Sequence, residues 1–364
     1  MSPRAGDVRQ RARALMERVL RAGATLEAEY PLVFREGSPG RLHSVEEGGE
    51  ARSACAVLVR DALAGGRRMR LGLIGSVSTD PAWRRRGLAS RVLDAAESDL
   101  AADGCLLALL WADDPDFYRG RGYHPLGAEV DFVLEPQARE ALPQATGVVR
   151  AAGRDDFAAI HRLYAHHRER SERSPEETAE LLAGPGIELL VLQRERDIAA
   201  YTCLGRGADF ARTIHEWAGA PEDVLALCRE HLGRAGARGE GTTHYLMTPP
   251  SARELQSRLR QIGCWDATGI LGMGKLLDPE AAAALLAESL GPAARVDVES
   301  EPLGAARITL RGPAGACSLD EGALLRLLFP PAEDRSELAR VRSATGLSLA
   351  GLPLPLFLWG LDSI

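Results

Sequence analysis

The stretch VSTDPAWRRRGLAS, residues 77–90, decides the fold of this 364-residue chain. An apolar, strand-like run precedes it, and from Gly87 onward apolar residues recur at helical spacing until Gly104. The first amides of a helix have no partner within the helix, and together with the helix dipole they attract an anion. Glycine at position 87 lets the backbone approach such a ligand, and the arginines at 84–86 add positive charge. The stretch predicts a strand, a phosphate-binding turn and a helix.

A solvated basic turn that caps a helix is the alternative interpretation of residues 84–89. The continuously apolar run CLLALLW, residues 105–111, follows the helix, as expected of a strand that is buried on both faces. This order of strand, turn, helix and buried strand favours a ligand-binding turn.

The pattern R-x-x-G-x-A on Arg84, Gly87 and Ala89 resembles the acetyl-coenzyme A signature of the GNAT acetyltransferase superfamily. The resemblance implies that the backbone of residues 77–79 pairs with the pantetheine arm and that the amides of residues 85–90 hold the pyrophosphate. It makes acetyl-coenzyme A the expected co-substrate. The residues expected to bind it are Val77, Ser78, Thr79, Arg84, Arg85, Arg86, Gly87, Leu88, Ala89 and Ser90.

A second motif, DFYRGRGY at 116–123, resembles the F-Y-x-x-x-G-F/Y element of the same superfamily, and Tyr118 matches its general acid. In a direct attack of an amine on a thioester, the leaving thiolate needs a proton. A phenol with a pKa of about 10 is still protonated at neutral pH and can supply it. For Tyr118 we favour this role over packing, whereas for Tyr123 we favour packing in the core.

Asp113 and Asp114 stand just before this motif. In the superfamily, coenzyme A contacts also come from this turn, so both residues are further candidates for binding the co-substrate. They are equally suited to attract a cationic amine, or to cap a short helix over 114–120. These alternatives stay open.

Residues 146–278 repeat the strand and helix order of the first region, but they lack its motif. After the strand expected at 212–219, the sequence is Ala-Pro-Glu-Asp at 220–223. Proline followed by two carboxylates is a good helix start, but the carboxylates would repel a pyrophosphate. We therefore expect no coenzyme A here, and a role in structure or as one wall of the acceptor cleft.

The whole plan resembles the enhanced-intracellular-survival type of acetyltransferase, which joins two GNAT units to a sterol-carrier-like domain. It implies an α/β fold with mixed sheets and three domains: a catalytic GNAT domain at 1–145, a degenerate one at 146–278 and a small sterol-carrier-like α/β domain at 279–364. In that type, the terminal carboxylate serves as the base or positions it, which makes Ile364 a second catalytic candidate. The alternative is that the apolar residues 352–360 only close the third domain and that Ile364 is solvated.

Composition narrows the class of protein. The net charge of −7 disfavours nucleic acid as a partner and mildly favours a cationic substrate. The six cysteines form no CxxC pair, so we expect free buried thiols in a cytoplasmic protein and no metal site. No apolar run is long enough to span a membrane. We expect a small-molecule or peptide amine as substrate and leave a homo-oligomer open.

Two other functions compete with an N-acetyltransferase. A non-catalytic acyl-coenzyme A sensor would keep residues 77–90 without using Tyr118. A lipid- or sterol-binding carrier would act through an apolar cavity in the third domain. The sequence does not name the amine acceptor.

Overall fold

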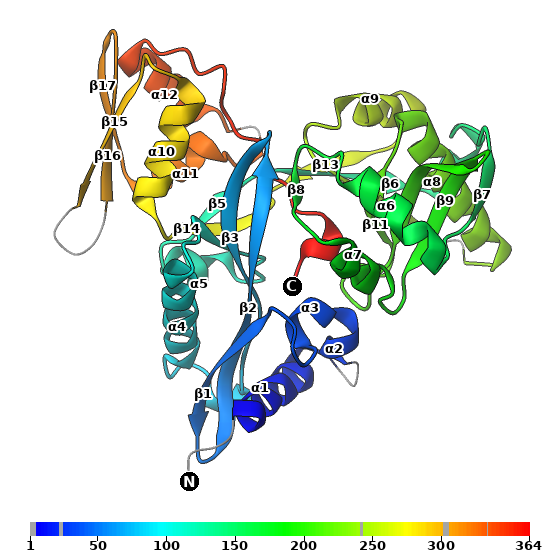
Figure 1. Cartoon of the computed structure of the whole chain (residues 1–364), viewed down its shortest axis with the longest axis horizontal. Helices are drawn as coiled ribbons and strands as arrows, with labels where there is room; N and C mark the ends of the chain where they lie inside the picture. Colours follow the sequence, from blue (N-terminus) through cyan, green and yellow to red (C-terminus); the bar gives the residue numbers. More distant parts are fainter. Residues whose placement is uncertain (1–4, 22–24, 241–242, 301–305, 333) are drawn as a thin grey trace.

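The computed structural model describes residues 5–21, 25–240, 243–300, 306–332 and 334–364. Two large mixed sheets lie side by side, and a smaller three-stranded sheet stands beyond the first of them (Figure 1). The mixed α/β class expected from the sequence is confirmed.

The first sheet has the strand order β1–β2–β3–β4–β14–β5, and β8 pairs with the far half of β2. All of its neighbouring strands are antiparallel except β3 and β4. Its strands are β1 (Arg41–Glu47), β2 (Glu50–Ala64), β3 (Arg67–Thr79), β4 (Leu107–Leu110), β5 (His124–Leu126), β8 (Arg170–Ser171) and β14 (Gly272–Leu276).

Helices cover both faces of this sheet. Successive residues of β2 alternate between two separate cores: Ala54 and Ala56 pack with α1 (Ala5–Leu20), and Cys55 and Val57 pack with α4 (Leu88–Ala102). Because side chains on a strand point alternately to opposite faces, the two helices lie on opposite sides of the sheet (Figure 1). The helices α2 (Leu26–Glu29) and α3 (Pro31–Phe34) follow α1 on its side.

The second sheet has the order β13–β6–β12–β11–β10–β9–β7. It repeats the parallel step of the first sheet, since β11 runs parallel to β12 and a helix, α8, connects them. Its elements are β6 (Glu129–Leu134), β7 (Val148–Ala151), α6 (Phe157–Tyr164), α7 (Pro175–Leu182), β9 (Glu188–Arg194), β10 (Asp197–Leu204), β11 (Thr213–Ala218), α8 (Pro221–Ala237), β12 (His244–Thr248), α9 (Arg253–Ile262) and β13 (Asp266–Gly269).

The two large sheets exchange strands. Strand β6 falls within the first expected domain, residues 1–145, but it pairs with β12 and β13 of the second sheet. In return, β14 from the second region lies between β4 and β5 of the first sheet. Alternating apolar residues identify a strand but not its partner, because the pairing uses backbone groups. The domain limits at 145 and 278 stay a prediction. Strand β6 precedes residue 145 but belongs to the second sheet, and β14 follows residue 145 but belongs to the first sheet.

The third region carries the antiparallel sheet β15–β16–β17 and three helices beside it. Leu310 and Leu319 of the sheet join the same core as Leu286 and Leu324 of the helices. A sterol-carrier-like role for this region stays a prediction. Its elements are α10 (Pro279–Leu290), β15 (Arg295–Ser300), β16 (Ala306–Gly312), β17 (Gly315–Leu319), α11 (Glu321–Leu328) and α12 (Ser336–Thr345).

The last residues of the sequence, drawn red in Figure 1, pass between the two large sheets. Leu356, Phe357, Trp359 and Leu361 are all buried, and a short 3-10 turn, η4 (Gly360–Asp362), ends the segment. The apolar end of the sequence therefore packs into the protein, and its alternative role, only to close the third domain, does not account for its contacts with the second region.

All six cysteines are buried and free, as predicted. Over the described residues, no group of histidine, cysteine and carboxylate side chains is arranged to hold a metal ion. No helix in the described part of the chain is long and apolar enough to cross a bilayer.

Candidate active site

The strands β3 and β4 separate in the middle of the first sheet. They pair only over residues 71–73 of β3 and 107–109 of β4, so beyond Leu73 no strand of the described residues pairs with this edge of β3. Ser76 has a positive φ of 52°, and the register between β2 and β3 shifts near Ala54. This irregularity bends the strand where its backbone donors and acceptors become available.

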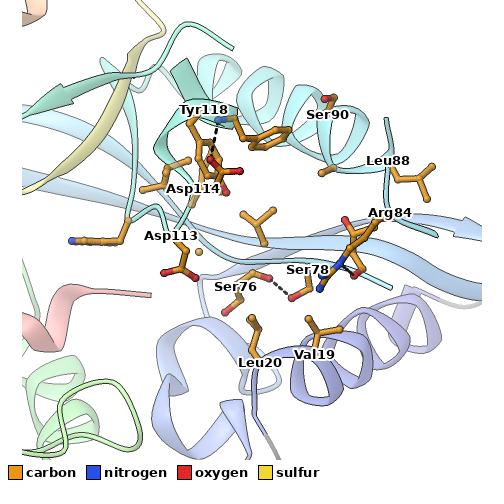
Figure 2. A pocket seen from close by; sticks show the side chains of 18 of the residues that line it. Val19, Leu20, Ser76, Ser78, Arg84, Leu88, Ser90, Asp113, Asp114 and Tyr118 are labelled. Atoms are coloured by element: carbon orange, nitrogen blue, oxygen red, sulfur yellow. Dashed lines mark hydrogen bonds between the residues drawn. The ribbon is translucent and has the colours of Figure 1, made fainter. Parts of the chain in front are cut away.

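A cavity of about 690 Å³ opens at this separation (Figure 2). Figure 2 shows Tyr118 and Asp114 on one side of it and Val19 and Leu20 of α1 on the other. Among the predicted site residues, those that line it are Val77, Ser78, Thr79, Arg84, Arg85, Gly87, Leu88, Ala89, Ser90, Asp113, Asp114, Tyr118 and Ile364. Residues that the sequence analysis missed also line it, namely Val19, Leu20, Arg21, Tyr30, Ile74, Gly75, Ser76, Leu110, Trp111, Phe117 and Asp209.

The start of α4 forms the basic end of the cavity. Gly87 is the N-cap residue, with a left-handed φ of 73°, and it offers no side chain to cap the first turn. The amides of Leu88, Ala89 and Ser90 therefore stand at a wall of the cavity as helix-start donors. Arg84 and Arg85 line the same end. This is the geometry in which a helix start binds a phosphate group.

Arg86, the third arginine expected to bind the co-substrate, does not line the cavity. Its guanidinium carbon lies 4.6 Å from the centre of the Trp83 ring, and that of Arg52 lies 4.7 Å from the same ring. The indole face attracts both cations, which gives Arg86 a partner in the turn itself. The sequence did not predict this stacking of Arg86 on Trp83, because nothing in the pattern around Trp83 indicates which side chains contact its ring.

Tyr118 lies on the one-turn helix α5 (Pro115–Arg119), which begins where Asp114 accepts a hydrogen bond from the amide of Phe117 at 3.4 Å. Asp114 thus caps the helix, which is one of the roles that the sequence left open, and it also lines the cavity. Burial raises the pKa of the Tyr118 phenol to about 12, so it is protonated at neutral pH. The neighbouring Tyr123 is fully buried and donates to Glu97 Oε1 at 3.0 Å, which confirms its predicted place in the core.

Asp209 brings the second region to the cavity. It lies in the loop between β10 and β11, and both Tyr30 and Arg21 of the first region donate hydrogen bonds to its Oδ2. Asp113 and Asp114 also line the cavity as carboxylates, whereas Arg84, Arg85 and Arg21, the partner of Asp209, line it as cations. The second region therefore contributes to the wall of this cavity, and its role as one wall of the acceptor cleft stays a prediction.

The corresponding helix start in the second region is occupied by ion pairs. Ala220 is the N-cap of α8, and Pro221 opens its first turn. Arg194 Nη1 donates to Asp223 Oδ2 at 2.8 Å, and Arg258 Nε donates to Glu222 Oε1 at 2.6 Å. That this end binds no coenzyme A stays a prediction.

Ile364 reaches the cavity and lies against β3. A Cβ atom on Gly75 would stand only 2.5 Å from the carbonyl carbon of Ile364, so glycine is required at this contact. In Figure 2 the neighbouring Ser76 and Ser78 lie on the same strand, and the Ser78 hydroxyl donates to the carbonyl of Ser76 at 3.1 Å. Tyr118 and Ile364, the two predicted catalytic residues, therefore line one cavity.

Two histidines contact the last residues of the sequence, 356–364, which we call the tail. They make the packing of the tail sensitive to acid. His167 donates from Nε2 to the carbonyl of Trp217 at 2.8 Å, and its ring lies 4.2 Å from that of Trp359. Burial lowers the pKa of His167 to about 4 and that of His215, which touches Gly360, to about 3.

We expect the free energy of unfolding to fall as the pH drops from about 6.5 toward 4. In this range the unfolded chain binds protons that the folded histidines exclude, so stability is present above the unfolded pKa and is lost below it. For His167 alone the loss at pH 5 is about 2 kcal/mol. Urea unfolding at pH 7 and pH 5 measures it, and His167→Gln should show a smaller loss. Equal stability at both pH values would contradict the expectation.

Comparisons with known proteins agree with this architecture. The family model of the acetyltransferase (GNAT) domain matches residues 9–126. No curated protein matches the chain in sequence. A GCN5-related N-acetyltransferase from Kribbella flavida is 16% identical, with a TM-score of 0.67 over 100% of this chain and 99% of its own.

Two further solved structures share the fold. A conserved protein of unknown function from Enterococcus faecalis V583, described as a probable N-acyltransferase, is 13% identical, with a TM-score of 0.65 over 88% of this chain and 85% of its own. Eis1 from Mycobacterium abscessus is 17% identical, with a TM-score of 0.59 over 98% of both chains. At these identities the likeness concerns the fold. The family match covers most of the residues that line the cavity: residues 9–126 form an acetyltransferase (GNAT) domain, and the protein is an acyltransferase.

Proposed function

We propose that this protein transfers an acetyl group from acetyl-coenzyme A to a primary amine. The observation that carries the proposal is the single cavity of about 690 Å³, which combines the free edge of β3, the uncapped start of α4, Tyr118 and Ile364. The reaction needs three things that these features can supply: a binding site for the donor, a proton for the leaving thiolate and a carboxylate close to the amine.

The donor is held along β3 and at the start of α4. The free backbone of residues 77–79 pairs with the pantetheine arm, and the amides of residues 88–90 with Arg84 and Arg85 bind the pyrophosphate. The pyrophosphate lies far from the reacting carbonyl. Its binding energy therefore serves to position the thioester for attack.

The amine nitrogen attacks the thioester carbonyl, a C–N bond forms and the C–S bond breaks without an acyl-enzyme. The Tyr118 phenol gives its proton to the leaving thiolate. In a chain that ends at Ile364, the α-carboxylate lies in the same cavity and takes the proton of the amine, directly or through water, or anchors the amine. The carboxylates of Asp113 and Asp114 favour a cationic acceptor.

Thiol release from acetyl-coenzyme A tests the proposal, with polyamines, aminoglycosides and lysine peptides as acceptors. We expect release of free thiol above the acceptor-free rate with at least one class of amine. Tight binding of acetyl-coenzyme A without thiol release for any amine would favour the acyl-coenzyme A sensor. A lipid carrier would keep its activity in a Gly87→Glu variant, whereas the acetyltransferase would not.

A further inference from the structure

We infer that Arg173, which lies in the second region outside the cavity, is a positioning residue that fixes Ile364 in the active site of the first region. The inference rests on the proposed function, because it gives a purpose to the place of Ile364. It assigns to the unit without a coenzyme A motif a direct part in the reaction geometry.

The first step of the argument is a buried ionic network that joins the tail to the second sheet. Arg173 Nε donates to Asp362 Oδ1 at 2.6 Å, and Arg173 Nη2 donates to Glu216 Oε2 at 2.8 Å. The side chains of all three residues have no exposed surface. Tyr164 donates to Asp362 Oδ2 at 2.8 Å, and Tyr201 donates to Glu216 Oε1 at 2.9 Å. Each carboxylate is therefore held by an arginine and a phenol.

A second buried arginine holds the other side of the same turn. Arg206 Nη1 donates to the carbonyl of Gly360 at 2.6 Å and to the carbonyl of Ser363 at 3.3 Å. Its guanidinium carbon lies 4.1 Å from the centre of the Tyr30 ring, and its Nε donates to the carbonyl of Glu29 at 3.0 Å. Arg206 thus ties the tail to the first region, while Arg173 ties it to the second.

The anchors leave the last residue little freedom. Ile364 follows Asp362 by two residues, which span at most about 7 Å even when fully extended. Ser363 between them is itself held by Arg206 and donates from Oγ to the carbonyl of Gly360 at 2.7 Å. On the far side Ile364 rests on Gly75 of β3. The position of the last residue is therefore set by the network and not by contacts within the cavity alone.

The charges explain why this network is suited to positioning. With Arg173 and Arg206 as cations and Glu216 and Asp362 as anions, the formal charges cancel in a buried region. Buried ion pairs contribute little net stability compared with apolar packing, and their best-attested use is to select one arrangement over others. An Asp362 side chain that finds its partners only beside Arg173 selects one register of the tail.

The test compares three variants of the full chain in steady-state acetyl transfer. Asp362→Asn keeps the shape of the anchor but removes its charge, and one glycine added after Ile364 moves the terminal carboxylate without touching the network. Asp223→Asn is the matched control, because Asp223 is also buried and paired with an arginine, Arg194, but lies at the start of α8. We expect both tail variants to lower kcat about tenfold or more with an unchanged KM for acetyl-coenzyme A. Asp223→Asn should keep the kcat of the natural chain.

Added formate separates positioning from stability. If the terminal carboxylate is only misplaced, formate should restore part of the rate in both tail variants. An unchanged kcat in Asp362→Asn, or a loss equal to that of Asp223→Asn and insensitive to formate, would overturn the inference. If the glycine extension alone slows the reaction, the role proposed for Ile364 stands while that of Arg173 fails. If the extension has no effect on kcat, the role proposed for Ile364 fails, and the inference about Arg173 fails with it.

A variant that leaves the network intact guards against misfolding of Asp362→Asn. Gly75→Ala places a methyl group against Ile364 from the side of β3. We expect it to lower kcat with the network in place, and formate should again raise the rate. A Gly75→Ala protein with full kcat would show that the position of Ile364 is unimportant.

Discussion

Replacing Tyr118 by phenylalanine is expected to lower kcat about 100-fold or more and to change the affinity for acetyl-coenzyme A very little. A positioned general acid contributes about 10²–10⁴ in rate, and phenylalanine fills the same space without a proton to give. Because burial raises the pKa of the Tyr118 phenol to about 12, the loss should be constant across the neutral range. Steady-state kinetics at several pH values, together with calorimetric binding of acetyl-coenzyme A, measure both quantities.

Tyr123→Phe is the control for this result. Its ring centre lies 5.7 Å from that of Tyr118, and its hydroxyl donates to Glu97 in the core rather than facing the cavity. The control should lose about 1–2 kcal/mol of stability and keep its kcat. Equal turnover in Tyr118→Phe and in the natural chain would remove Tyr118 from its role.

Replacing Gly87 by glutamate is expected to weaken the binding of acetyl-coenzyme A about 100-fold, a change near 3 kcal/mol. The new carboxylate would stand at the positive end of the α4 dipole, where the pyrophosphate is expected to bind. The affinity is measured by calorimetric titration of the folded variant.

Gly104→Glu provides a matched control at the other end of the same helix. Gly87 and Gly104 have φ values of 73° and 72°, and an added Cβ meets no atom within 4 Å at either position. Both variants therefore carry the same backbone strain, but Gly104 does not line the cavity. A loss of affinity of the same size in both variants would mean that strain, and not the charge at the site, weakens binding.

The elements around the site were predictable where one segment determines its own structure. The helix expected from Gly87 is α4, because its apolar residues recur at helical spacing and pack as one face. The start of α7 is likewise marked within its own segment, since Ser174 and Glu177 form a capping box there.

Features that depend on two distant segments were not predictable. Strand β14 was missed because its glycine-rich sequence GMGKL has little strand character. Asp209 enters the cavity through a loop whose position is set by Tyr30 and Arg21. The close contact of Gly75 with Ile364 exists only because the tail is anchored elsewhere.

The exchange of β6 and β14 makes the two large sheets one cooperative unit. A fragment that ends between them would leave β4 and β5 without the strand that joins them, and both would present unpaired edges. Neither half can complete its hydrogen bonding before the other is present, so folding requires closure of long loops and the association of both halves. The region that lacks the coenzyme A motif is in this way inseparable, during folding, from the region that carries it.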